Sequence, residues 1–410
     1  MDLFFDVLPV PEVLKKLADY WQPDVTAVEE VALTEALGRV LAQAVTAADD
    51  VPPFSRSTVD GFAVRAADTF GASEGLPAFL NILEDIRMGQ VPQKELDIGD
   101  TSCIATGGML PPGADAVAMV EYSETVDDCT VAIVKPVAPG ENVIRRGEDI
   151  LGGTQLLVAG QRLRPADIGA LAAVGTTRVL VRQAPKVGIL STGDEIVPPA
   201  TVPAPGQVRD INSYSLGAAV QAAGGEPVYL GLAEDKFETV HAAVKDGLAR
   251  CDLVLLSGGS SVGDRDVSAK VLAKLGPPGV LVHGVALRPG KPLLAALCQG
   301  KPVFGLPGHP ASALVTFNLF ARPVIERLLG LTPAPRPSLR ARLTRNLASA
   351  SGREDHVRVR LLSEEDGLAA EPILGKSGLI TTLVEADGTI IIPSECEGLL
   401  AGEEVEVYPL

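Results

Sequence analysis

A glycine- and serine-rich stretch followed by two carboxylates is the segment of this chain best suited to chemistry. Four apolar residues, Leu253–Leu256, precede it and are typical of a strand that is buried on both faces. Backbone N–H groups and hydroxyls in such a stretch can surround an anion, and a hard cation that bridges to phosphate needs carboxylates beside them. The segment comprises Ser257, Gly258, Gly259, Ser260, Ser261, Val262, Gly263, and then Asp264 and Asp266. An ordinary strand-to-helix turn is the alternative interpretation of the glycines alone.

Three other predicted strands also end in polar or glycine-rich residues. Ser191–Glu195 follows the first, Glu234 and Asp235 follow the second, and Leu306–Pro310 follows the third. The carboxyl ends of parallel strands share one edge of an open α/β sheet, and ligands bind at that edge. We therefore expect all four loops to converge on a single site.

The elements that position these loops alternate between strand and helix over residues 178–330. This βαβ series predicts a three-layer αβα sandwich with a parallel sheet. The expected strands are 186–190, 226–230, 253–256 and 302–306, and the expected helices are 213–223, 237–249, 267–275 and 310–329.

Polar segments earlier in the chain are further candidates. Asp60 precedes Gly61 in a proline-flanked stretch, where it either makes an Asx-turn or presents a carboxylate from a rigid loop. Thr106 ends a strand beside two glycines, for which a tight turn is the simpler interpretation. Residues 145–149 combine two arginines with two acids around a glycine. They form either a surface salt-bridge cluster or an anion site beside Asp149.

Composition narrows the possible partners. The 410 residues carry a net charge of −17, and only 4% are aromatic, which argues against binding nucleic acid or an anionic membrane. We find no membrane span and no secretory signal. The five cysteines form no CxxC pair and are odd in number, so we expect free, buried thiols in a reducing compartment, the cytoplasm.

Four domains are expected. Residues 1–49 and 141–178 form a helical linking domain, with helices expected over 26–31, 34–44 and 165–174 among others. Residues 50–140 form an inserted β-rich domain, residues 179–331 the α/β domain, and residues 332–410 a small C-terminal β-barrel. We expect no catalytic constellation in the barrel.

Seven motifs together carry a resemblance to a known family. In order along nearly the whole chain they are FSRSTVDGFAVR (54–65), ATGGMLPPGADAV (105–117), RRGEDI (145–150), STGDEI (191–196), SGGSSVGDRD (257–266), RPGKP (288–292) and LPGHPASA (306–313). The chain thus resembles the molybdopterin molybdotransferases, and is similar to the E-domain of gephyrin.

The resemblance implies an activity and an assembly. Members of this family insert molybdate into adenylylated molybdopterin, release AMP and use Mg²⁺, in the last step of molybdenum cofactor synthesis. They are homodimers of four-domain protomers, and a molybdopterin adenylyltransferase supplies their substrate. The site would lie between the α/β domain of one subunit and the insert region of the other. Carried over by motif, the catalytic residues would be Asp60, Thr106, Asp149, Glu195 and Asp266.

The binding residues implied by the resemblance fit that chemistry. Asp266 with Glu234 or Asp235 would ligate Mg²⁺, and the sequence does not choose between the last two. Backbone amides of 257–263 would hold phosphates, with Arg288 and Lys291 adding positive charge and Pro307 and Pro310 shaping the last loop. Arg288, Ser312 and Thr106 are candidates for the oxyanion site. We expect His309 and His283 to be structural or adjacent to the substrate.

Some residues depart from the family pattern. Ser260 replaces a valine, Val267 a tyrosine and His309 an asparagine. These changes leave open the pterin contacts and whether the metal is molybdenum or tungsten. Two other hypotheses are an adenylyltransferase of the same pathway and a non-catalytic molybdopterin-binding scaffold. A scaffold would be free to lose Asp60, Asp149 and Asp266, and all three are present.

Overall fold

The computed structural model describes residues 7–258, 267–332 and 335–410. These residues form two compact units. One contains residues 30–37 and 41–180, and the other contains the described residues up to 29 together with 38–40 and 181–410. The domain boundaries expected from the sequence within these units stay predictions.

The larger unit contains a six-stranded sheet in the order β16-β13-β17-β21-β20-β18. The first four strands are parallel, as expected from the βαβ series. The last two add an antiparallel hairpin edge that the sequence reasoning did not predict. The strands are β13 (Lys186–Thr192), β16 (Glu226–Ala233), β17 (Leu253–Ser257), β18 (Gly279–His283), β20 (Leu294–Cys298) and β21 (Lys301–Leu306). Between β13 and β16 in the sequence, two short strands, β14 (Ile196–Val197) and β15 (Val208–Arg209), form a separate parallel pair.

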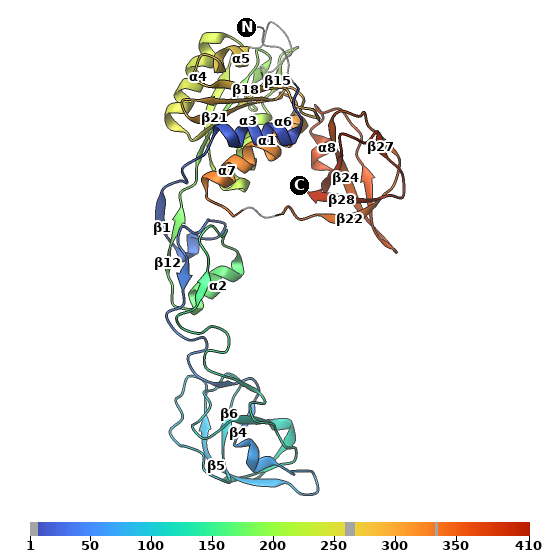
Figure 1. Cartoon of the computed structure of the whole chain (residues 1–410). Coiled ribbons are helices and arrows are strands. Elements are labelled where there is room, and N and C mark those ends of the chain that lie inside the picture. The colour runs from blue at the N-terminus through green and yellow to red at the C-terminus, as the bar shows by residue number, and fades with distance from the viewer. Residues whose placement is uncertain (1–6, 259–266, 333–334) are drawn as a thin grey trace. The chain divides into compact units, whose positions relative to one another are not determined.

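Helices cover both faces of this sheet (Figure 1). Strand β17 shows why, because its four apolar residues alternate between two hydrophobic cores. Leu253 and Leu255 pack with α1, α3, α6 and α7, whereas Val254 and Leu256 pack with α4 and α5. The predicted three-layer sandwich is therefore confirmed. The helices are α1 (Val10–Tyr20), α3 (Asn212–Ala223), α4 (Phe237–Arg250), α5 (Val267–Leu272), α6 (Pro310–Thr316) and α7 (Arg322–Leu328), with a π-helical turn at Phe317–Ala321.

A closed five-stranded barrel follows, as expected. Its strands pair in the order β24-β25-β22-β28-β26, and β26 pairs back to β24 to close it. The core comes from alternate inward residues such as Val359, Ile390 and Val407. The elements are β22 (Leu339–Leu343), β23 (Leu347–Ala348), β24 (Glu354–Glu364), β25 (Gly367–Pro372), α8 (Thr381–Val384), β26 (Gly388–Ile392), β27 (Gly398–Leu399) and β28 (Glu404–Pro409). Strand β19 (Leu287–Arg288), from the α/β part of the chain, pairs in parallel with β24.

The smaller unit contains a second six-stranded sheet, in the order β7-β4-β6-β5-β9-β8. Phe62, Leu80 and Val131 are among its core residues. Its strands are β4 (Gly61–Val64), β5 (Ala78–Ile86), β6 (Asp100–Ile104), β7 (Ala116–Met119), β8 (Ser123–Asp127) and β9 (Thr130–Ile133). Shorter elements are β2 (Val45–Thr46), β3 (Arg56–Ser57), β10 (Val143–Ile144), β11 (Gln155–Leu157) and three single turns at Leu33–Glu35, Ala66–Thr69 and Val120–Tyr122.

The helices predicted over 26–31 and 34–44 are wrong. Residues Val28–Ala32 form strand β1, which pairs with β12 (Arg178–Arg182), and only Leu33–Glu35 make a short helical turn. Backbone pairing accounts for the difference, because the Leu33 N–H donates to the Thr177 carbonyl and the Ala42 N–H to that of Leu180. Tertiary pairing thus overrides the local helical pattern. The helix expected at 165–174 is confirmed as α2 (Pro165–Ala173).

The cysteines are all free, and Cys251 and Cys298 are buried. Burial raises the pKa of the Cys298 thiol to about 11, so that thiol is inert near neutral pH. Cys129 is exposed, which differs from the expectation of buried thiols. Across the residues that the structure describes, no helix combines the length and apolar character needed to cross a bilayer.

Candidate functional site

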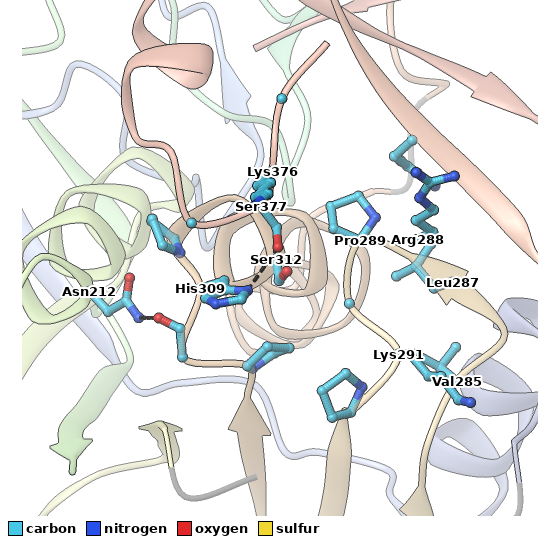
Figure 2. Close-up of a pocket in the computed structure, with 18 of the residues that line it drawn as sticks. Asn212, Val285, Leu287, Arg288, Pro289, Lys291, His309, Ser312, Lys376 and Ser377 are labelled. Atoms are coloured by element: carbon cyan, nitrogen blue, oxygen red, sulfur yellow. Dashed lines mark hydrogen bonds between the residues drawn. The ribbon is translucent and has the colours of Figure 1, made fainter. Parts of the chain in front are cut away.

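A cavity of about 2000 Å³ opens in the larger unit where the carboxyl ends of the parallel strands lie. Its lining comes from the strand ends after β13, β16, β17 and β21, from residues 285–292, and from the C-terminal barrel. The expected convergence of the strand-end loops on one site is therefore confirmed for their described residues. In Figure 2, His309, Ser312 and Ser377 lie between Asn212 and the loop that carries Arg288, Pro289 and Lys291.

The lining is basic although the chain as a whole is acidic. Among the described residues it includes six lysines and arginines (Arg209, Arg288, Lys291, Arg353, Arg358, Lys376) against four acids (Glu195, Asp210, Asp235, Asp355). On a chain with a net charge of −17, such a local excess of positive charge favours an anionic ligand.

The end of β17 is held from α3. The Asn212 side-chain amide donates to Ser257 Oγ at 2.7 Å and to the Gly308 carbonyl at 2.7 Å, so it ties two strand ends together. Gly258 has φ +98°, and a Cβ there would lie 2.2 Å from the Thr192 carbonyl oxygen. Only glycine therefore lets the chain turn sharply enough for its backbone to line the cavity.

The acidic residues at the strand ends divide into two groups. Glu195 and Asp235 line the cavity. Glu234 instead pairs with Lys236 and is mostly exposed. Partial burial raises the pKa of Asp235, and the nearby carboxylates of Asp194 and Glu195 raise it further. Of the two residues left open by the sequence, Asp235 thus lines the cavity and Glu234 does not.

A cation at this rim would need ligands beyond these side chains. In the described part of the chain, no three His, Cys, Asp or Glu side chains converge closely enough to hold a metal ion. Mg²⁺ in proteins is commonly held by one or two carboxylates together with the phosphates of a substrate. The carboxylates of Glu195 and Asp235 fit that incomplete type of site.

The turn of Arg288–Lys291 brings two positive charges to the lining. Gly290, at φ +130°, allows this turn to pack closely on α6, since a Cβ there would lie 2.7 Å from Thr316 Cγ2. Arg288 Nη1 donates to Asp355 Oδ2 at 3.3 Å, and the same carboxylate accepts from Arg353 Nε at 3.0 Å.

The last strand-end loop leads into α6. Pro307 and Pro310 are both buried and line the cavity, as does the buried Ser312. His309 Nδ1 lies 2.8 Å from Ser377 Oγ of the barrel, so His309 joins the α/β domain to the barrel.

Arg358 is a lining residue that the sequence reasoning missed. It is only 7% exposed, its Nη2 donates to the Gly375 carbonyl at 3.2 Å, and its Nε has no hydrogen-bond partner among the described residues. Burial lowers the pKa of this guanidinium. The sequence offered only a weak signal, three arginines (Arg353, Arg358 and Arg360) within residues 353–360.

The smaller unit holds three of the candidate residues. The Thr106 backbone N–H donates to Asp60 Oδ1 at 2.7 Å, so these residues meet although they are 46 positions apart. The adjacent Gly61 allows β4 to lie close to β7, because a Cβ there would lie 2.0 Å from the Ala118 carbonyl oxygen. Asp149 is exposed and lines a separate cavity of about 330 Å³.

Five candidates lie outside the described residues: Gly259, Ser260, Ser261, Gly263 and Asp266. Their assignments stay predictions.

Three family descriptions match the chain. They are the MoeA N-terminal region (domains I and II) over residues 8–175, a probable molybdopterin binding domain over 188–327, and the MoeA C-terminal region (domain IV) over 340–410.

Individual relatives match along almost their whole lengths. A putative molybdopterin biosynthesis protein of Methanocaldococcus jannaschii is 36% identical, with 100% of each chain covered. The molybdopterin molybdenumtransferase of Bacillus subtilis is 35% identical, with 98% of this chain and 93% of that protein covered. A crystal structure of the molybdopterin biosynthesis MoeA protein from Pyrococcus horikoshii is 32% identical with a TM-score of 0.85, covering 99% of this chain and 100% of that one. The chain therefore belongs to the MoeA family, the molybdopterin molybdotransferases that its seven motifs indicated.

Proposed function

We propose that this protein inserts molybdate into adenylylated molybdopterin and releases AMP, in the last step of molybdenum cofactor biosynthesis. The observation that carries the proposal is the basic cavity at the strand ends of a strongly acidic chain. Both substrates are anions, one an oxyanion and the other bearing a pyrophosphate. Family membership, with relatives named as molybdopterin molybdenumtransferases, supports the same reaction.

The phosphates would lie against the end of β17. Gly258 brings the backbone close to the cavity there, and Ser257 presents a hydroxyl that Asn212 orients. Backbone and hydroxyl donors aimed at a phosphate need no reorganisation when it binds. The candidates at Gly259–Gly263 would extend this cradle.

The oxyanion would lie between the basic turn and the barrel. Arg288 and Lys291 come from the turn, Ser312 from α6, and Arg358 and Ser377 from the barrel. Arg358 supports this assignment most directly, because a buried guanidinium with an unpartnered Nε is costly until an anion satisfies it.

Mg²⁺ would be held by Asp235 and Glu195 together with ligand phosphates, and by Asp266 according to its motif. When bound, the cation would neutralise charge on the pyrophosphate. The carboxylates themselves would keep the anionic ligand away from that rim until the cation arrives, which gives the pyrophosphate one orientation.

We propose that the protein is a homodimer and that three residues of the smaller unit act on the same substrates, as their motifs imply. These residues are Asp60, Thr106 and Asp149. The Thr106 N–H holds the Asp60 carboxylate in one orientation, which suits a residue that must meet a ligand from outside its own unit. We further propose a cytoplasmic location and an upstream molybdopterin adenylyltransferase as partner.

Single-turnover release of AMP tests the proposal. Adenylylated molybdopterin is mixed with excess full-length enzyme and Mg²⁺, with molybdate, tungstate or neither. We expect AMP release that depends on the oxyanion, and the faster oxyanion identifies the metal. Absence of release from folded protein under all three conditions would contradict the transferase and favour a molybdopterin-binding scaffold.

Two variants of the same strand sharpen this test. Arg358→Gln removes the buried guanidinium and is expected to slow oxyanion-dependent release at least about 10-fold. Arg360→Gln is the matched control, because Arg360 is exposed and pairs with Glu371 and Glu385 on the barrel surface. Equal rates of AMP release for the two variants would mean that Arg358 is not part of the oxyanion site.

A further inference from the structure

The basic turn of the α/β domain is held by the C-terminal barrel. Strand β19 pairs in parallel with β24, which places Arg288 opposite Asp355. The Glu354 N–H also donates to the Ala286 carbonyl at 2.9 Å. The backbone that leads into the turn is therefore an edge of the barrel sheet.

Asp355 lies at the centre of this junction. Its side chain is only 4% exposed, and its two oxygens accept from different guanidiniums, Oδ2 from Arg288 and Oδ1 from Arg353. A buried carboxylate is tolerated only when it is paired and hydrogen-bonded, so both contacts stabilise its charge. One negative charge between two arginines leaves the junction positive.

The contact between Arg288 and Asp355 restrains the Arg288 side chain more than it restrains the Asp355 side chain. The Arg288 side chain is 61% exposed, and a long exposed arginine samples many rotamers unless something holds it. Asp355 is fixed by burial and by Arg353, so it can hold the exposed Arg288 side chain in place.

We propose that Asp355 is a positioning residue that orients the Arg288 guanidinium for the oxyanion. The inference rests on the proposed function, since it assumes that Arg288 contacts the oxyanion. It assigns a role to the barrel, in which the sequence indicated no chemistry. The barrel then contributes both Arg358 directly and the orientation of Arg288.

The test is a double-mutant cycle on the full-length protein. Binding of molybdate alone is measured by calorimetry, and KM and kcat for molybdate are measured in the AMP-release assay. Asp355→Asn is expected to weaken molybdate binding and to raise KM about 5- to 20-fold, with kcat changed less than about twofold. Arg288→Ala should have at least that effect. The double variant should match Arg288→Ala, because Asp355 has nothing left to orient, and Asp355→Glu should recover most of the affinity.

Several results would overturn the inference. Tighter molybdate binding by Asp355→Asn would mean that the carboxylate only offsets positive charge. If Asp355→Asn lowers molybdate affinity equally in the presence and in the absence of Arg288, the role of Asp355 is purely structural. If Asp355→Asn does not fold, Arg288→Lys replaces it, since it alters only an exposed side chain. Unchanged affinity in that variant would show that no oriented guanidinium is needed.

The outcomes also separate this inference from the proposed function. If wild-type protein binds no molybdate and releases no AMP, both the proposed function and the positioning role of Asp355 are wrong. If wild-type protein binds molybdate and releases AMP but the double-mutant cycle is additive, only the positioning role is wrong.

Discussion

The two walls of the large cavity differ in chemistry and in how they are built. The α/β wall offers carboxylates and backbone at strand ends, with Glu195, Asp235 and Gly258 exposed to the cavity from loops. The barrel wall offers guanidiniums, with Arg358 buried within strand β24 and Arg353, just before that strand, paired to Asp355. In the function proposed above, the strand ends suit the cation and the pyrophosphate, whereas the barrel, together with Arg288, Lys291 and Ser312 of the α/β domain, suits the oxyanion. The barrel thus contributes to one of the two proposed subsites and not to the other.

The largest effect expected from breaking this division comes from Asp235→Asn. AMP release should fall about 100-fold, because the rim loses the carboxylate best placed to hold Mg²⁺. Glu234→Gln is the matched control one position away, and we expect a change of at most a few-fold because Glu234 pairs with Lys236 outside the lining. Single-turnover rates over a Mg²⁺ titration measure both. Equal losses would mean that the cation site uses both acids.

Asp235→Asn should also change stability in a pH-dependent way. Because the folded-state pKa of Asp235 lies above its usual value of 3.8, the folded chain binds more protons than the unfolded chain. The resulting penalty is absent well below pH 3.8, grows as the pH rises from there, and is complete above the raised pKa. Without Mg²⁺, the variant should therefore have a higher Tm than wild type at pH 7 and the same Tm at low pH. Scanning calorimetry over that range measures the difference, and a variant less stable at pH 7 would contradict it.

The next effect concerns the backbone of the α/β wall. Gly258→Ala should destabilise the protein by about 2–4 kcal/mol, since alanine is strained at φ +98° and its Cβ would collide with the Thr192 carbonyl. Gly308→Ala should cost less than about 1 kcal/mol, because the nearest atom to a Cβ there is 3.7 Å away. Urea unfolding compares the two. Similar costs would show that the β17 turn has room to relax.

The same contrast explains what the sequence could reveal. The acids and glycines of the α/β wall directly follow apolar runs, so a local pattern predicted both the strands and the convergence of their ends. Arg358 occupies an ordinary position in an alternating strand. It reaches the cavity only through closure of the barrel and the barrel's contact with α6, where the Ala311 N–H donates to the Ser377 carbonyl. Nothing local distinguishes it from the exposed Arg360 two positions later.

The failed helix predictions have a related cause. Residues 26–44 carry an apolar pattern that local reasoning assigns to helices, but hydrogen bonds to residues 177–183 take up their backbone groups. Those partners are some 140 positions away in sequence. Asp60 and Thr106 were each recognised as candidates, yet their contact depends on sheet pairing between β4 and β6. Long-range pairing is thus the part of this molecule that sequence patterns did not reveal.

The smallest effect, and the one that tests the barrel wall most directly, comes from Arg358→Met. Methionine fills a similar volume without a charge, and replacing a buried, incompletely paired ion by an apolar side chain is often stabilising. We expect unfolding to require about 1–2 kcal/mol more free energy in the variant, while AMP release falls as it does for Arg358→Gln. A variant that is more stable but less active would show that the buried charge of Arg358 serves ligand binding and not the stability of the fold. If Arg358→Met is instead less stable than wild type without any oxyanion, the guanidinium is satisfied within the protein, and the barrel wall supports the fold and does not bind the oxyanion.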